Sequence, residues 1–231
     1  QFYSETGGEI IVSGDVTSGD VDQGVDGGSI KIAGANGLKI LAEVSTLAGE
    51  GGSVTIEEGS VDTESAKISV GAGDIVLTGN EVSDLLIVSV NIQRAESILL
   101  EHDGDIIIRA IVETTLPGSD ITIRADSNGS GRGGVIIEPT GFVKSGRDIL
   151  VSGSDCISTP DAIDSVYVRE DVLEGAQLQA AGDVSITSGP DAPEGAVLRI
   201  EGGIEASGDS GMVLDAAGDI RTAATLVAKG G

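Results

Sequence analysis

The sequence predicts an all-β protein: a right-handed parallel β-solenoid (β-helix) that residues 1–231 form as one elongated domain. Three observations favour this fold. A turn-and-strand phrase recurs along the chain, short apolar runs alternate with polar residues, and apolar stripes at helical spacing are nearly absent. Hydrophobic residues make up 39% of the chain but aromatic residues only 2%. The core must therefore be built from Ile, Val, Leu and Ala, which suit thin layers stacked on one another.

The recurring phrase is a glycine, an aspartate and a branched apolar residue. It occurs as Gly14-Asp15-Val16, Gly73-Asp74-Ile75, Gly104-Asp105-Ile106, Gly182-Asp183-Val184 and Gly218-Asp219-Ile220, with looser copies at Ser119-Asp120-Ile121 and Arg147-Asp148-Ile149. We interpret it as a turn that feeds a strand, because glycine supplies unusual backbone angles and aspartate hydrogen-bonds its own local backbone. The uneven spacing of the copies indicates coils with loops of variable length.

Strand-sized runs follow one another along the whole chain, separated by clusters of Gly, Ser, Asp and Asn. The predicted strands are Ile10–Val12, Ile30–Ile32, Leu38–Leu41, Val54–Ile56, Lys67–Val70, Ile75–Leu77, Leu85–Val90, Ile98–Leu100, Ile106–Ile108, Ile121–Ile123, Val135–Ile137, Ile149–Val151, Val166–Val168, Val184–Ile186, Val197–Ile200 and Met212–Leu214. In many of them apolar and polar residues alternate, which is typical of strands with one buried face.

An antiparallel β-sandwich is the alternative fold, since it also produces many short strands at regular spacing. A sandwich, however, favours two-residue hairpin turns, aromatic core residues and strands that do not repeat. The solenoid is therefore the favoured prediction, and the usual crossover preference gives it a right hand. Two or three strands per coil correspond to coils of about 20 to 36 residues, and so to roughly seven to eleven coils.

The formal charge of −25 arises from 38 acidic and 13 basic residues. Such a surface repels phosphate backbones and anionic lipids, so we expect no nucleic-acid partner and no membrane insertion. No run of apolar residues approaches the length of a membrane span. The lone cysteine, Cys156, is expected to be a buried structural thiol. The chain starts at Gln1, which favours a removed signal or an excised segment.

The two termini suggest how such coils assemble. Residues 1–6 include Phe2 and Tyr3, half of the aromatic residues of the chain. They form either a strand that caps the first coil or a docking segment that adds to a neighbouring molecule. The C-terminal Thr225–Gly231 carries no aromatic or charged lid. Head-to-tail stacking of copies is therefore an expectation of the sequence. Residues 154–165 and 189–193, which contain prolines, are expected to leave the solenoid as loops.

No cofactor is required by the predicted fold, and calcium is the best candidate for one. Asp20, Asp22 and Asp26 lie in a glycine-rich segment and are candidate ligands, with turn aspartates as the alternative interpretation. No carboxylate pair stands out for glycosidic chemistry. The single histidine, His102, is expected to be a partly exposed turn residue. The sequence thus predicts that the protein is not an enzyme.

Three segments carry a resemblance to a known family. They are residues 27–34 (GGSIKIAG), 71–79 (GAGDIVLTG) and 181–189 (AGDVSITSG). They resemble the repeats of filamentous-haemagglutinin-type proteins and, more broadly, the β-strand repeats of large bacterial surface exoproteins. The asparagine-proline-asparagine signature of the family's secretion domain is absent, so the resemblance is to the repeat shaft. It implies a right-handed β-helix, secretion, and a role in adhesion or surface fibres.

Together these observations predict a structural extracellular protein: a subunit or segment of a surface filament, fibre or adhesin. Its partners would be further copies of itself or the flanking repeats of a longer chain. A calcium- or carbohydrate-binding solenoid module is the alternative, and a polysaccharide-active enzyme is less favoured.

Overall fold

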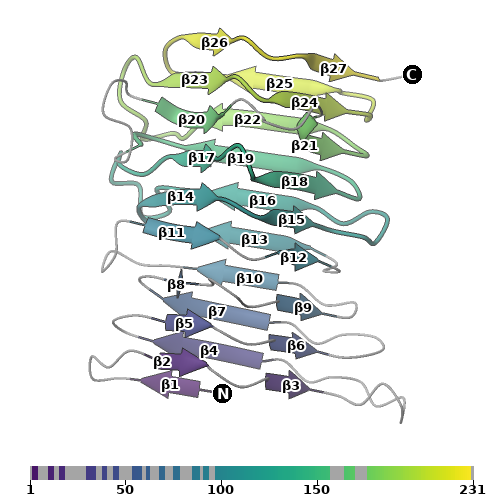
Figure 1. The fold of residues 1–231 in the computed structure, drawn as a ribbon. Helices are drawn as coiled ribbons and strands as arrows, with labels where there is room; N and C mark the ends of the chain where they lie inside the picture. The colour runs from purple at the N-terminus through teal and green to yellow at the C-terminus, as the bar shows by residue number, and fades with distance from the viewer. Residues whose placement is uncertain are drawn as a thin grey trace.

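The computed structural model describes residues 97–156, 164–169 and 176–229, together with Asn91 and the strand segments between residues 2 and 93. In this part of the chain 27 strands form three nine-stranded sheets, and each strand pairs with the strand three places along the chain (Figure 1). The paired strands run parallel, from the first coil to the last. The prediction of a β-solenoid is confirmed, and the antiparallel sandwich is excluded.

Every strand of the first sheet is three to five residues long. Its members are β1 (Phe2–Ser4), β4 (Ile30–Gly34), β7 (Val54–Glu58), β10 (Ile75–Thr78), β13 (Ile98–Glu101), β16 (Ile121–Arg124), β19 (Ile149–Gly153), β22 (Val184–Ser188) and β25 (Met212–Asp215). The second sheet consists of β2 (Ile10–Val12), β5 (Leu38–Ile40), β8 (Val61–Asp62), β11 (Leu85–Val88), β14 (Asp105–Ile108), β17 (Val135–Ile137), β20 (Asp164–Val168), β23 (Val197–Ile200) and β26 (Ile220–Thr222). The third sheet consists of β3 (Val16–Ser18), β6 (Val44–Thr46), β9 (Ile68–Val70), β12 (Ile92–Gln93), β15 (Ile111–Glu113), β18 (Phe142–Ser145), β21 (Ala176–Ala180), β24 (Gly203–Ala206) and β27 (Leu226–Ala228).

One strand of each sheet makes a coil, so the described strands form nine coils, from β1–β3 to β25–β27. The coils differ in length: the first-sheet strands start 21 residues apart between Val54 and Ile75 but 35 residues apart between Ile149 and Val184. At about 4.8 Å per strand spacing, the eight steps from first to last coil span roughly 38 Å. The two ends of the chain lie at opposite ends of the stack (Figure 1).

The core is a set of apolar columns that run along the solenoid axis. In the first sheet, Leu100, Ile123, Val151 and Ile186 occupy consecutive positions of one column and are buried. The residues that alternate with them are half-buried or exposed, as in the pattern of β16. Each fully buried side chain of this kind contributes about 1.5–3 kcal/mol of hydrophobic free energy. In strands such as β16, alternation in the sequence therefore indicates which face points inward.

The second sheet differs because parts of it are buried on both faces. All four residues of β14 and all three of β17 are buried. On its outer face Ile107 and Ile136 form a small apolar cluster with Cys156. The chain that follows β19 therefore lies over this outer face. Strand β20 begins at Asp164, inside the range 154–165 for which the sequence predicts a loop, and residues 189–193 lie between β22 and β23.

The described part of the chain contains strands and turns, and none of it is a helix long and apolar enough to cross a membrane.

Candidate functional site

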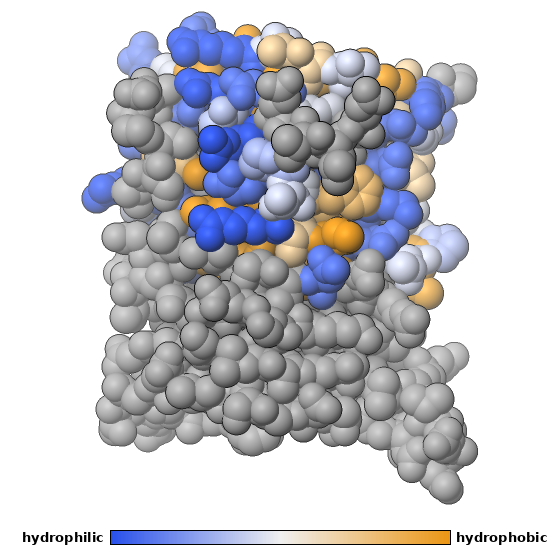
Figure 2. All heavy atoms as spheres, viewed as in Figure 1, coloured by the Kyte–Doolittle hydropathy of each residue, from blue (hydrophilic) through white to orange (hydrophobic). Residues whose placement is uncertain are grey.

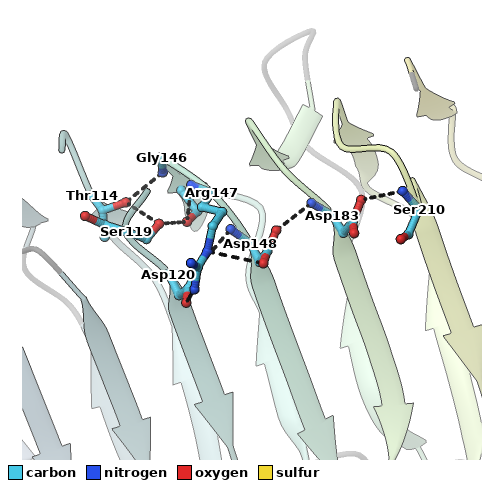
Figure 3. A network of polar contacts seen from close by, with 9 residues as sticks. Thr114, Ser119, Asp120, Gly146, Arg147, Asp148, Asp183 and Ser210 are labelled. Atoms are coloured by element: carbon cyan, nitrogen blue, oxygen red, sulfur yellow. Dashed lines mark hydrogen bonds and ion pairs between the residues drawn. The ribbon is translucent and has the colours of Figure 1, made fainter. Parts of the chain in front are cut away.

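A row of aspartates lies where strands of the first sheet begin (Figure 3). Asp120 Oδ1 accepts a hydrogen bond from the backbone N–H of Asp148 at 3.2 Å. Asp148 Oδ1 accepts one from the N–H of Asp183 at 2.9 Å, and Asp183 Oδ1 accepts one from Gly211 at 2.8 Å. Each carboxylate thus binds its own coil to the following coil. We call Asp120, Asp148 and Asp183 the aspartate ladder.

The ladder corrects the interpretation of the recurring phrase. Aspartates of the phrase are predicted to bond their own local backbone, yet the bonds of Asp120 and Asp148 reach residues 28 and 35 positions away. The physical reason is stacking: equivalent residues of neighbouring coils lie only about 4.8 Å apart, within reach of a short side chain. Local bonding does occur elsewhere. Asp126, which has a positive φ of 56°, accepts hydrogen bonds from the Gly131 N–H and the Ser130 hydroxyl.

Arg147 reinforces the ladder from its exposed side. Its Nε donates to Asp120 Oδ1 at 2.7 Å and its second guanidinium nitrogen pairs with Asp120 Oδ2, while Asp148 Oδ2 lies 3.4 Å from Nε. The hydrogen bond to Asp120 is the main cause that raises the pKa of Arg147. Because the guanidinium is more than half exposed, the stability gain from this pair is small.

Polar groups are buried at the start of β14, a strand of the second sheet. Asp105 Oδ1 accepts a hydrogen bond from the Gly134 N–H at 2.8 Å, and the Cys156 thiol donates to Asp105 Oδ2 at 3.5 Å. A side chain at Gly134 would overlap Cys156, whose Cβ lies 2.6 Å from the position of such a Cβ. Cys156 is buried, as the sequence predicts, and fills the space that the glycine leaves. The contact between Gly134 and Cys156 is thus one of packing.

Asp164 is the least satisfied carboxylate of the described residues. It is fully buried, and neither of its oxygens has a hydrogen-bond partner. The Nε of Arg199 lies 3.6 Å from Oδ1. Desolvation raises the pKa of Asp164, and Arg199 and Arg221 oppose that shift.

Tyr167 connects this acid to a surface charge network. Its hydroxyl donates to Glu201 Oε2 at 2.7 Å. The guanidinium groups of Arg199 and Arg169 lie over its ring, at 4.9 and 5.7 Å from the ring centre. Burial is the main cause that raises the pKa of Tyr167. Arg169 in turn pairs with Glu138 at 2.8 Å. The network links three successive strands of the second sheet, so its evident effect is to hold coils together.

The ion pairs between coils all have the same order of base and acid along the chain. In six pairs of the described residues, the base belongs to the later coil and the acid to the coil before it. These pairs are Arg124–Glu101, Lys144–Glu113, Arg147–Asp120, Arg169–Glu138, Arg199–Asp164 and Lys229–Glu205. The aspartate ladder has the same direction, whereas the bond from Tyr167 to Glu201 has the opposite one. Carboxylates of one coil therefore serve mainly as acceptors for the next.

The ninth coil exposes residues that occupy core columns. Leu198 and Ile204 are fully buried in the eighth coil, whereas their register partners Ile220 and Leu226 are 45% and 37% exposed. Within the described residues, β25, β26 and β27 have no strand on their far side. One core column ends in a polar residue, Thr222. The end of the stack is thus a mixed but mainly apolar surface with free strand edges.

The structure places the predicted docking residues at the other end. Phe2 pairs in register with Ile32, in the column that continues through the buried Leu100. Tyr3 occupies the neighbouring column, whose described members, such as Glu101 and Arg124, are partly or fully exposed. Strand β1 is the end strand of the first sheet. The docking role itself stays a prediction.

The predicted calcium ligands Asp20, Asp22 and Asp26 lie outside the described residues. Among those that are described, no three His, Cys, Asp or Glu side chains gather as a metal-binding group. The predicted exposure of His102 is wrong: it is fully buried, and its Nδ1 accepts a hydrogen bond from the Gly104 N–H at 2.8 Å. The ring is therefore part of the turn that leads into β14.

Comparison with known proteins adds no relative: no protein family, no curated protein and no solved structure matches the chain.

Proposed function

We propose that this chain is a structural, non-enzymatic protein: a subunit or segment of a secreted surface filament, fibre or adhesin that joins head to tail. The observation that carries the proposal is the open ninth coil. Ile220 and Leu226 continue columns that are fully buried one coil earlier, yet each is more than a third exposed. A further coil on this end would bury them and pair the free edges of β25–β27.

The first coil of a second copy has the residues to continue these columns. Following the strand register along each sheet, Phe2 shares a column with Leu214, Ile10 with Ile220, and Val16 with Leu226. All strands of a sheet run in the same direction, so β1, β2 and β3 of one copy would add to β25, β26 and β27 of another without any change of geometry. The joint would repeat the contact that already occurs between neighbouring coils.

The remaining properties suit a fibre. The net charge of −25 keeps parallel rods apart and soluble. Figure 2 shows polar and charged residues over much of the described face, with smaller apolar areas between them. The buried Asp105 carboxylate and the Cys156 thiol, near the start of β14, are engaged in contacts within the fold, which supports a role without catalysis. The resemblance of the repeats to surface exoproteins supports an extracellular location.

Electron microscopy of the purified 231-residue chain tests the proposal. We expect unbranched filaments whose axial repeat is about 43 Å, the height of nine coils at roughly 4.8 Å each. Leu226→Asp is expected to abolish them, because a carboxylate would replace an apolar contact at the joint. Val213→Asp is the matched control: Val213 is 48% exposed but lies on the outer face of β25, in the column of the exposed Leu150.

A monodisperse monomer at every protein and salt concentration would contradict the proposal, and more so if that monomer bound glycans. Filaments of unchanged length in Leu226→Asp would place the joint elsewhere on the molecule.

A further inference from the structure

We propose that the head-to-tail joint is controlled by charge, so that copies repel one another at low ionic strength and stack when salt screens their carboxylates. This inference rests on the proposed function and adds its regulation. The docking surface is the open face of the ninth coil, and its occupant is the first coil of a second copy of this chain.

The first step is the direction of the ion pairs inside the solenoid. In all six pairs between coils of the described residues, the later coil supplies the base and the earlier coil the acid. A coil that adds to the C-terminal end is the later coil of its joint. By this rule it should bring lysines or arginines to the carboxylates of the ninth coil.

The first coil of the chain cannot do so. Residues 1–30 contain six carboxylates and no lysine or arginine; the first base of the sequence is Lys31. The bases of the ninth coil are already engaged, Lys229 with Glu205 and Arg221 with Asp219. Asp209 and Asp215 are exposed and have no ion-pair partner among the described residues. A head-to-tail joint therefore brings carboxylates toward carboxylates, whereas each joint from the fifth coil to the ninth has a base in the later coil.

The strand register identifies one position at which this deficit can be repaired. If β1 of one copy pairs with β25 of another with Phe2 opposite Leu214, then Tyr3 lies opposite Asp215. Both residues belong to the column in which Arg124 lies opposite Glu101 and forms an ion pair. An arginine in place of Tyr3 would reproduce that pair across the joint.

Screening decides between attraction and repulsion at such a joint. The apolar contacts are short-range and do not depend on ionic strength, whereas exposed charges repel over a distance set by the Debye length. That length falls from about 30 Å at 0.01 M salt to about 10 Å at 0.1 M. Wild-type chains should therefore stay apart in dilute salt and associate as the carboxylates are screened.

Sedimentation velocity at pH 7.5, in sodium chloride from about 10 mM to 500 mM, measures the critical concentration for assembly. We expect the wild-type value to fall by about tenfold across this range. Tyr3→Arg should lower the critical concentration about threefold in dilute salt, the size of one exposed ion pair, and should flatten the salt dependence. Tyr3→Gln, which removes the ring without adding a charge, is the control and should not assemble better than wild type in dilute salt.

The outcomes separate the two proposals. Filaments with the same critical concentration at both ends of the salt range would overturn charge control and leave the proposed function intact. Charge control is equally overturned if Tyr3→Arg behaves like Tyr3→Gln in dilute salt. An absence of assembly at any salt concentration, in wild type and in Tyr3→Arg, would overturn the joint itself and charge control with it.

Discussion

The interior coils and the ninth coil have the same architecture but differ in what covers their core columns. In the eighth coil Ile204 is completely buried, while its register partner Leu226 in the ninth is 37% exposed. The second sheet shows the same contrast between Leu198 and Ile220. The residue types are alike, so the difference arises from the following coil, which the described residues supply for the eighth coil and not for the ninth. Burial in this molecule is supplied by the neighbouring coil.

This contrast implies that stability is the sum of contacts between neighbouring coils. A coil contributes little by itself, because three short strands cannot enclose a core. Each joint from the fifth coil to the ninth combines apolar columns, parallel strand pairing and ion pairs in one direction. The ninth coil continues the columns, but no described base lies on its far side. The comparison can be tested by changing equivalent positions in the two regions.

The largest difference in stability between the two regions is expected when two residues of the same apolar column, one in the eighth coil and one in the ninth, are each replaced by alanine. Ile204→Ala should lower the free energy of unfolding by about 3 kcal/mol, since it removes a fully buried side chain and leaves a cavity. Leu226→Ala in the same column should cost less than about 1 kcal/mol, because much of that side chain is already in water. Urea unfolding in dilute salt, followed by far-UV circular dichroism, measures both. Equal losses for the two variants would show that the ninth coil is covered in solution.

The three sheets differ in how well the sequence predicts them. Apart from the short terminal strand β1, every strand of the first sheet is predicted, because each contains two or three large apolar residues within three positions, as in Ile121–Arg124. In the third sheet only β9 is predicted from its apolar run, and β3 is indicated only by the phrase Gly14-Asp15-Val16. Strands such as β15 and β24 place a single large apolar side chain in the core, Val112 or Ile204, and one residue sets no period. Their strand state is imposed by stacking on the coils below and above.

The candidate site is predicted only in part for the same reason. The phrase that contains Asp148 is visible in the sequence, but the hydrogen bond to Asp183 crosses to the next coil. To predict such a bond one must know the length of each coil. The phrases are unevenly spaced, so they do not give that length. Arg147 is part of a looser copy of the phrase, and its pairing with Asp120 likewise needs the stack. The sequence thus predicts the local turn, but it does not predict the hydrogen bonds and ion pairs that join one coil to the next.

An intermediate difference in stability between the interior and the ninth coil is expected when a carboxylate is removed from each. Asp148→Ala should destabilise the chain by about 1–2 kcal/mol, because the Asp183 N–H loses its acceptor and Arg147 loses one of its two partners. Asp148→Asn keeps an oxygen acceptor and should recover most of the loss. Asp215→Ala, at the open end, should change stability by less than about 0.5 kcal/mol. If Asp148→Asn were as damaging as Asp148→Ala, charge rather than the hydrogen bond would hold the joint.

The smallest difference in stability is expected for the buried Asp164, and it is measured as a change in the free energy of unfolding with pH. Desolvation raises the pKa of Asp164 in the folded chain, with Arg199, Arg221 and Glu201 as its charged neighbours. Since the folded pKa exceeds the unfolded one, the contribution of this group to stability is complete below the unfolded pKa, near 3.9, and is lost as pH rises through the folded pKa. Asp164→Asn removes that loss. Its free energy of unfolding relative to wild type should therefore be more favourable at pH 7 than at pH 4.

Asp215→Asn is the matched control for this measurement, since it also deletes one negative charge but at an exposed position of the ninth coil. Its difference from wild type should stay nearly constant between pH 4 and pH 7, apart from the general relief of self-repulsion that both variants share. Subtracting the two pH profiles isolates the burial of Asp164. A subtracted profile that is flat would mean that Asp164 is as well solvated or paired as the carboxylates at the open end, and that the interior joint places no ionisation penalty on the chain.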